Sequence, residues 1–192
     1  MISQSTRIPL EVGTFRISYH RFEQGACLSI AYGNVKAGIP LVRIHSSCLF
    51  GESLHGLDCD CAAQLDGTLK LIKEHGKGVI VYQFAEGRGI GLEEKIRALE
   101  LQRTRGIDTV EAFRVMGLPP DLRSYDIPVK ALEDLGVSKE IIFASQNPVK
   151  LAAVQEAGFL VRERRYPKVK ITKYNKPELL VKKYKLGHDI DI

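Results

Sequence analysis

Three cysteines lie close together in the stretch CLFGESLHGLDCDCAAQ, at Cys48, Cys59 and Cys61. Thiolates are soft ligands, so this C-x10-C-x-C spacing predicts a zinc site rather than a magnesium or calcium site. Three protein ligands leave one coordination position for water, as in catalytic zinc centres. A fourth ligand, His45 or His55, would instead close the site into a structural one. The spacing alone leaves both alternatives open.

A glycine-rich turn follows the cysteines in the sequence. The segment EGRGIGLEEK, residues 86–95, comes after a short apolar run and opens a helical pattern. Free backbone N–H groups at such a strand-to-helix turn can bind an anion, and Arg88 lies among them. The glycines are equally explained by the backbone conformations that a tight turn requires. The turn therefore indicates an anion site only in combination with other segments.

Two polar segments further along could contribute to the same chemistry. In GLPPDLRSYDIP, Asp121 and Arg123 stand two residues apart, so in an extended segment both side chains would converge on one substrate. A simple ion pair between them is the alternative. In SQNPVK, Ser145 or Asn147 is expected to cap a helix, and Lys150 is placed to reach a phosphate.

The elements that must position these residues follow from the apolar pattern. The first 46 residues alternate like β-strands at 7–22, 26–35 and 40–46, and we expect an antiparallel sheet there. Helical patterns then alternate with short strands at 78–84 and 140–145; the helical ranges are 62–76, 91–106, 109–117, 128–136, 147–158 and 177–187. This order predicts an α+β (mixed α/β) fold.

Length and composition bound the remaining possibilities. A chain of 192 residues with 44% hydrophobic residues suits one domain over 1–192, with a basic C-terminal segment at about 166–192. No run approaches the ~20 apolar residues of a membrane span, which predicts a cytoplasmic protein without a membrane partner. Disulfides are not expected in that compartment, and Cys27 is expected to be an ordinary buried thiol. The basic excess between Arg162 and Lys185 indicates an acidic partner or a solvated basic face.

Seven motifs occur in order along the chain. They are VRIHSSC, CDCAAQLD, EGRGIGL followed by K and RA, DTVEA, PPDLRSY, QNPVK and the closing KLGH. Together they run from about residue 8 to 188, and in this order they resemble GTP cyclohydrolase II, the family that opens riboflavin biosynthesis. The resemblance implies a GTP cyclohydrolase II-like fold and a homodimer.

The resemblance also implies a mechanism. The three cysteines would hold one catalytic zinc ion per chain, its bound water would attack C8 of the guanine ring of GTP, and formate would leave. Magnesium would assist the triphosphate, pyrophosphate would be released, and the pyrimidine product would keep one phosphate. Asp121 matches the proton acceptor and Arg123 the nucleophile at the α-phosphorus, although a protonated guanidinium could instead stabilise phosphoryl charge. The positions matched to nucleotide contacts are Arg43, Ile44, His45, Ser46, Ser47, Gln64, Glu86, Gly87, Arg88, Thr109, Ser145 and Lys150.

Several positions depart from the family pattern. HSSC replaces HSEC, so that Ser47 stands where the family has a carboxylate, FAEGR replaces RQEGR, and SQNP replaces TNNP. Leu99 stands where the family usually has a catalytic tyrosine, and a leucine cannot donate a hydrogen bond. It completes an apolar stripe with Leu92 and Ile96 that we expect to pack in the core. Two hypotheses follow: the product keeps its formyl group, or the substrate is another purine nucleotide.

A non-catalytic nucleotide- or RNA-binding protein is the alternative from a different class. The altered positions and the basic C-terminal segment favour it. The three cysteines, Asp121 and Arg123 favour the enzyme. RNA binding also calls for exposed aromatic side chains on which bases stack, and the basic segment offers few, so nucleic acid is the less expected partner.

Overall fold

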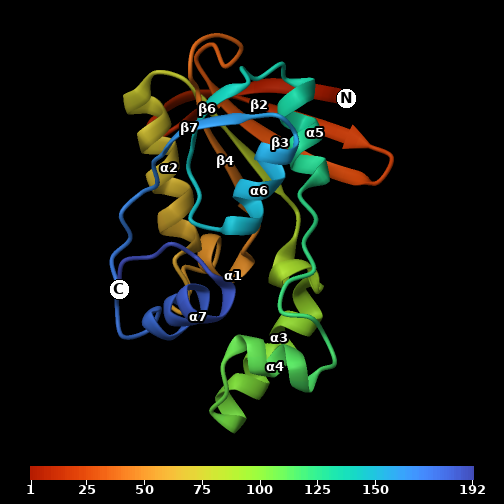
Figure 1. The fold of residues 1–192 in the computed structure, drawn as a ribbon, viewed down its shortest axis with the longest axis vertical. Helices are drawn as coiled ribbons and strands as arrows, with labels where there is room; N and C mark the ends of the chain where they lie inside the picture. The colour runs from red at the N-terminus through yellow and green to blue at the C-terminus, as the bar shows by residue number, and fades with distance from the viewer. The chain divides into compact units, whose positions relative to one another are not determined.

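The computed structural model describes every residue from Met1 to Ile192 and forms two compact units. Unit 1 comprises Met1–His45, Ala63–Phe84 and Tyr125–Lys168, and it holds the β-sheet (Figure 1). Unit 2 comprises Ser46–Ala62, Ala85–Ser124 and Val169–Ile192, and its regular elements are mostly helical. A single domain over 1–192 stays a prediction.

The sheet has seven strands in the order β1-β2-β3-β5-β4-β6-β7. The strands are β1 (Ile2–Leu10), β2 (Gly13–Phe22), β3 (Gly25–Tyr32), β4 (Leu41–Ser46), β5 (Gly78–Gln83), β6 (Glu140–Phe143) and β7 (Leu160–Arg164). Pairing is antiparallel between β1 and β2, β2 and β3, and β3 and β5, and it is parallel between β4 and β6 and between β6 and β7. The predicted mixed α/β fold is confirmed.

The expectation that residues 40–46 join an antiparallel sheet is wrong, because β4 pairs in parallel with β6. The first five residues of β4 are all buried, as is typical of a central parallel strand covered on both faces. Strand β7 was not predicted, since its sequence LVRER carries three charged residues and reads as a solvated segment. Its place at the edge of the sheet explains that composition.

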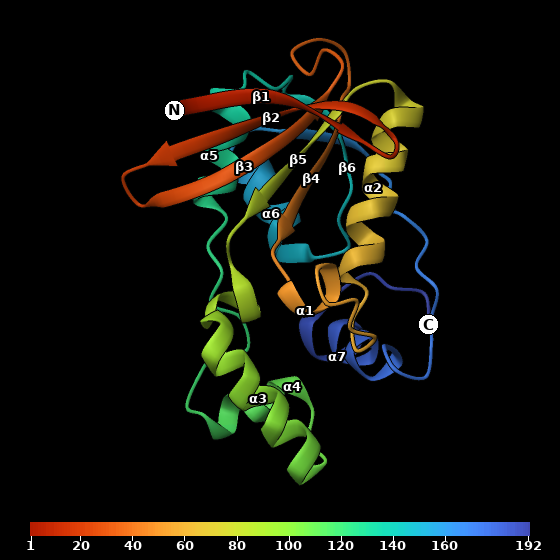
Figure 2. The same ribbon diagram turned by 180° about the vertical axis from the view of Figure 1, so that it is seen from behind.

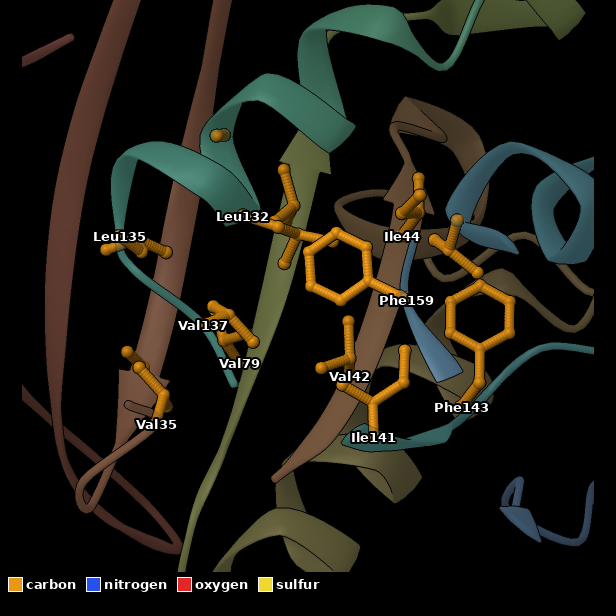
Figure 3. Packing of buried hydrophobic residues seen from close by; sticks show 14 of the residues in the cluster. Val35, Val42, Ile44, Val79, Leu132, Leu135, Val137, Ile141, Phe143 and Phe159 are labelled. Carbon is orange, nitrogen blue, oxygen red and sulfur yellow. The ribbon is translucent and has the colours of Figure 1, made fainter. Parts of the chain in front are cut away.

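Helices cover both faces of the sheet in unit 1 (Figures 1 and 2). Helix α2 (Cys61–His75) packs Ile72 into a cluster with Leu41. Helices α5 (Asp126–Asp134) and α6 (Pro148–Glu156) cover the other face, where Leu132 joins Val42 and Ile44 (Figure 3). Adjacent residues of β4 thus point into opposite cores, so the strand that carries the VRIHSSC motif is fixed from both sides.

Unit 2 contains α1 (Leu49–Glu52), the 3₁₀ turn η1 (Glu86–Gly89), α3 (Gly91–Arg105), α4 (Thr109–Val115) and α7 (Lys176–Leu186). Helices α3 and α4 pack through Ala98 and Phe113. The expected core stripe on α3 is wrong, because Leu92 and Ile96 are 38% and 52% exposed and Leu99 is only half-buried. The buried Ala98 follows Ile96 by two residues, about 200° around the helix, so α4 covers the other side.

Some of the basic C-terminal residues are paired within the chain. Four of the ten between Arg162 and Lys185 form ion pairs, which are Arg162–Glu140, Arg165–Glu163, Lys182–Asp60 and Lys185 with Asp108 and Glu111. These pairs reduce the charge that an acidic partner would meet. Among the helices, none has both the length and the apolar character that crossing a membrane requires.

Candidate functional site

The three clustered cysteines come together in unit 2. Cys48 directly precedes α1, and Cys61 is the first residue of α2. Their sulfur atoms and that of Cys59 all lie within 4.8 Å of one another, and no histidine belongs to the group. The Cys48 and Cys59 sulfurs are 3.7 Å apart, and tetrahedral zinc with bonds of about 2.3 Å sets its sulfur ligands ~3.8 Å apart. The Cys48–Cys59 distance therefore matches the spacing of two zinc ligands, and the third sulfur lies close enough to join them.

The three thiols of the cluster differ in their pKa values. Hydrogen bonds from Cys59 and Cys61 hold the pKa of Cys48 far below its usual range. The hydrogen bond with Cys48 raises the pKa of Cys59 to about 11, and hydrogen bonds with Cys48 and Cys59 raise the pKa of Cys61 well above its ordinary value. The three thiols are thus close enough to shift one another's pKa values.

Unit 2 supplies a tight wall and a cation beside the thiols. A Cβ at Gly51 would lie 2.7 Å from the Cys59 sulfur, so the backbone of α1 packs directly on the cluster. The Lys95 ammonium donates to the Cys48 sulfur at 3.3 Å and to a Glu86 carboxylate oxygen at 2.6 Å. The other Glu86 oxygen accepts from the Leu49 amide at 2.7 Å. Glu86, expected to contact a nucleotide, thereby links η1 to α1 and Lys95.

The glycine-rich turn has a strained conformation. Gly87 and Arg88 are both left-handed, with φ of 60° and 57°, and Arg88 pays a steric cost that glycine avoids. The Arg88 carbonyl accepts from the Leu122 amide at 3.0 Å, and its guanidinium pairs with Glu178 at 2.7 Å. A Cβ at Gly89 would meet the Leu122 carbonyl carbon at 3.1 Å. The turn therefore packs backbone to backbone against the segment that carries Asp121 and Arg123.

Asp121 and Arg123 form a two-pronged ion pair. The Arg123 Nε donates to Asp121 Oδ1 at 2.8 Å, and its Nη2 donates to Oδ2 at 2.5 Å. The pair is partly buried, and Arg123 also donates to the Ser46 hydroxyl at 3.2 Å. Burial alone would raise the pKa of Asp121, but hydrogen bonds and charge from Arg123 outweigh it and lower that pKa. The structure therefore contains the ion pair between these two residues, and Arg123 connects it to Ser46 of the VRIHSSC motif.

Thr109 is the first residue of α4, whose start is fixed by a capping box between Asp108 and Glu111. Its hydroxyl lies 2.9 Å from Glu178 Oε2 and 3.1 Å from Gln102 Oε1. Glu178 also pairs with Arg88, so one carboxylate of α7 engages two residues that the family resemblance matches to nucleotide contacts.

A buried polar group lies in unit 1. Arg43, 6% exposed, donates to the His45 Nδ1 at 3.1 Å, to the Ala144 carbonyl at 2.8 Å and to the Gln64 Oε1 at 2.5 Å. The His45 ring stacks on Tyr82, with 5.5 Å between ring centroids. Arg43 thereby fixes the orientation of the Gln64 amide and the His45 ring.

The segment at 145–150 completes this group in unit 1. Asn147 caps α6, because its side chain accepts from the Val149 and Lys150 amides, while the Ser145 hydroxyl accepts from the Asn147 amide. Lys150 is 6% exposed and donates to the Ile44 carbonyl at 3.0 Å. Of the two predicted caps, Asn147 is therefore the residue that caps the helix.

The structure places the sequence-predicted residues in two groups. Unit 1 holds Arg43, Ile44, His45, Gln64, Ser145 and Lys150, and unit 2 holds the three cysteines, Ser46, Ser47, Glu86, Gly87, Arg88, Thr109, Asp121 and Arg123. Cys27 lies apart, fully buried, and burial raises its pKa to about 11, as expected of an inert thiol.

Sequence reasoning missed four residues that contact these groups. Lys95 was part of a quoted motif, and Glu52, whose carboxylate accepts from the Cys48 amide at 2.9 Å, lies one helical turn after that cysteine. Both could have been found from spacing. Glu178 and Lys182 lie more than a hundred residues from the cysteines in the sequence, and no local pattern points to them.

Comparison with known proteins agrees with these motifs. Residues 2–166 match the family model described as GTP cyclohydrolase II. The chain is 44% identical over 188 residues to riboflavin biosynthesis protein RibBA of Aquifex aeolicus, covering 96% of this chain and 46% of the relative. It is 41% identical over 186 residues to GTP cyclohydrolase-2 of Actinobacillus succinogenes, covering 95% and 85%. The chain thus spans about half the length of the first of these relatives.

A solved structure is also similar, at a weaker level. It is described as RibBX, a two domain 3,4-dihydroxy-2-butanone 4-phosphate synthase from A. baumannii, with 17% identity and a TM-score of 0.46 over 88% of this chain and 40% of that one. A likeness of this size bears on neither fold nor function. The family match over most of the chain and the identity to its relatives are sufficient: the chain belongs to the GTP cyclohydrolase II family.

Proposed function

We propose that the chain is a zinc-dependent hydrolase that acts on GTP in the manner of its family. One water opens the imidazole ring at C8, a second hydrolyses the resulting formamide to formate and an amine, and a third cleaves the bond between the α- and β-phosphates to release pyrophosphate. The product is a diaminopyrimidine that carries a ribosylamino 5′-phosphate. The observation that carries the proposal is the group of three thiols within 4.8 Å of one another.

Cys48, Cys59 and Cys61 would hold the metal, because three thiolates suit zinc and their spacing matches tetrahedral coordination. When bound, zinc supplies Lewis-acid activation of water at neutral pH. Lys95 beside Cys48 offsets part of the negative charge of three thiolates. Glu52 and Gly51 hold the Cys48 backbone and the Cys59 thiol in place.

Arg123 is proposed to stabilise charge on a phosphoryl group. Acting as a nucleophile, it would have to lose a proton to Asp121, whose pKa is lowered further by the ion pair itself. The guanidinium pKa exceeds that of an aspartate by more than about 8, so this transfer costs roughly 11 kcal/mol. A guanidinium that keeps its proton presents several donors to phosphate oxygens, and this arrangement needs no such transfer.

The buried group of unit 1 is proposed to contact the nucleotide through Arg43, His45, Gln64, Ser145 and Lys150. Two buried cations in one group suit a ligand of high negative charge. In unit 2 the corresponding proposals are Ser46, Ser47, Glu86, Gly87, Arg88 and Thr109. Magnesium on the triphosphate, a homodimer and a cytoplasmic location remain predictions.

The proposal is tested by incubating the purified chain with zinc, magnesium and each of a panel of purine nucleotides, and identifying the products by mass. We expect GTP to give formate, pyrophosphate and the deformylated pyrimidine. Cys61→Ser removes one proposed zinc ligand and should abolish turnover. Cys27→Ser removes a cysteine outside the cluster and is the matched control. A wild-type chain that binds one zinc ion and consumes no purine nucleotide would refute the proposal.

Leu99 makes the same experiment informative about the product. Leu99 has no hydroxyl group, unlike the tyrosine that the family usually has at this position. The side chain is only half-buried, and the apolar stripe of its helix does not form a core, so core packing does not account for a leucine here. A product that keeps the formyl group would assign this chain to a variant reaction. Stoichiometric free formate from GTP would exclude that variant.

A further inference from the structure

A buried ion pair lies directly beside the metal ligands. Asp60 stands between Cys59 and Cys61 in the sequence, and its side chain is only 2% exposed. The ammonium of Lys182, from α7, donates to Asp60 Oδ1 at 2.5 Å and is itself 15% exposed. The two residues are 122 positions apart, so this contact joins the end of the chain to the cysteine loop within unit 2.

The position of Asp60 gives the contact its importance. Asp60 is bonded through its backbone to both neighbouring ligands, so holding its side chain restrains the torsion angles that aim the Cys59 and Cys61 sulfurs. The tight approach of Gly51 also leaves the Cys59 sulfur little freedom. Both α1 and the Lys182 contact therefore restrain the loop, and the helices α1 and α7 lie next to each other in both views (Figures 1 and 2).

Helix α7 is itself firmly seated in unit 2. Leu179 and Val181 are buried, and Glu178 engages both Arg88 and Thr109. Glu178, Lys182 and Lys185 follow one another at four and three residues, a spacing that places them on one face of a helix. Because these contacts hold α7 in place, the Lys182 ammonium has a defined position.

Charge supports the same conclusion. Zinc with three thiolates and the Asp60 carboxylate carries a net charge of minus two. Lys182 offsets the charge of Asp60, and Lys95, 3.3 Å from the Cys48 sulfur, is shared between that sulfur and the Glu86 carboxylate. Removing one of these cations leaves an uncompensated buried charge next to the ligands, which is costly.

We propose that Lys182 is a positioning residue of the metal centre, which orients the Cys59 and Cys61 ligands through Asp60. The inference rests on the proposed zinc site and adds to it a helix that lies beyond the family-matched residues 2–166. Groups that orient metal ligands typically change metal affinity by about 10- to 100-fold when they are removed.

The test measures the zinc dissociation constant of the full chain by competition with a chromophoric chelator, and the absorption of the Co²⁺-loaded chain as a report on ligand geometry. Lys182→Met is expected to raise the dissociation constant about 10- to 100-fold and to shift the Co²⁺ spectrum. Lys185→Met is the matched control, because it removes an ion pair with Asp108 and Glu111 from the same helix and leaves Asp60 untouched. It should stay within about threefold of wild type.

Because Lys182→Met removes the cation beside the buried Asp60 carboxylate, the double variant Asp60→Asn with Lys182→Met serves if the single variant does not fold. It removes both charges and the anchor together, and the expected loss of affinity is the same. An unchanged dissociation constant in the folded variant, or an equal loss in Lys185→Met, overturns the proposal. A wild-type chain that binds no zinc would instead refute the zinc site itself, so the two failures are distinguishable.

Discussion

Replacing Gly51 by alanine tests the geometry of the metal centre without touching a ligand. The new methyl group would lie 2.7 Å from the Cys59 sulfur, whereas unbonded heavy atoms rest at about 3.5 Å or more. The thiol must therefore retreat by roughly 0.8 Å, several times the ~0.2 Å within which metal–ligand distances are held. We expect zinc affinity to fall at least about tenfold, or ~1.4 kcal/mol.

The fold itself should tolerate this substitution. Gly51 lies in α1 and its φ is not in the left-handed region, so alanine adopts the same backbone and is favoured in a helix by about 0.5–1 kcal/mol. Zinc competition and Co²⁺ absorption measure the effect, and thermal unfolding of the metal-free chain checks the fold. Ser53→Ala, at the exposed end of the same helix, is the control. Wild-type affinity and an unchanged Co²⁺ spectrum in Gly51→Ala would refute the reasoning.

Three further predictions follow. Arg123→Ala should abolish pyrophosphate release from GTP. The control is Arg165→Ala, which breaks a similar two-pronged ion pair with Glu163 and should leave pyrophosphate release near normal. Near-normal release in both variants would remove Arg123 from the mechanism. Burial lowers the pKa of His20, although the hydrogen bond and charge of Asp134 act in the opposite direction. The folded chain therefore favours the neutral ring. The stability that this preference provides is present above about pH 6.5 and is lost as the pH falls through the lowered pKa. The free energy of unfolding, measured with denaturant, should therefore fall more steeply between pH 7 and 5 in wild type than in His20→Gln. An equal pH dependence in the two chains would contradict this. Ile96→Gln should change the free energy of unfolding by less than about 0.5 kcal/mol, whereas Phe113→Ala should cost roughly 3–5 kcal/mol, and a large loss in Ile96→Gln would restore the core stripe.

The sequence predicted the elements well where one physical signal dominates. Leu65, Leu69 and Ile72 recur at helical spacing and pack together in the structure, and Gly76 ends that helix with a left-handed backbone. The same rule failed on α3, because periodicity shows that a stripe exists and does not show whether another element covers it. Ala98, too small to stand out in a pattern, marks the face that α4 covers.

Pairing direction was the part of the sheet that the sequence could not give. Residues 41–46 read as a strand in either direction, and the parallel direction becomes visible only when β6 lies beside them. The candidate site shows the same division. Its ligands and its glycine-rich turn have local patterns, whereas Glu178 and Lys182 make contacts with residues 90 and 122 positions away in the sequence.

The polar group of unit 1 depends on residues that are far apart in the chain. Arg43 meets the Ala144 carbonyl across 101 positions, and Lys150 meets the Ile44 carbonyl across 106. Hairpins such as β1–β2–β3 close short loops, but β4 and β6 must find each other across a long one, and contacts of that kind form slowly. Folding order follows from this topology: the antiparallel strands can assemble early, while the buried arginine and lysine reach their partners only when the chain has closed this long loop. A partly folded chain would therefore carry a nearly complete hairpin sheet and lack this polar group.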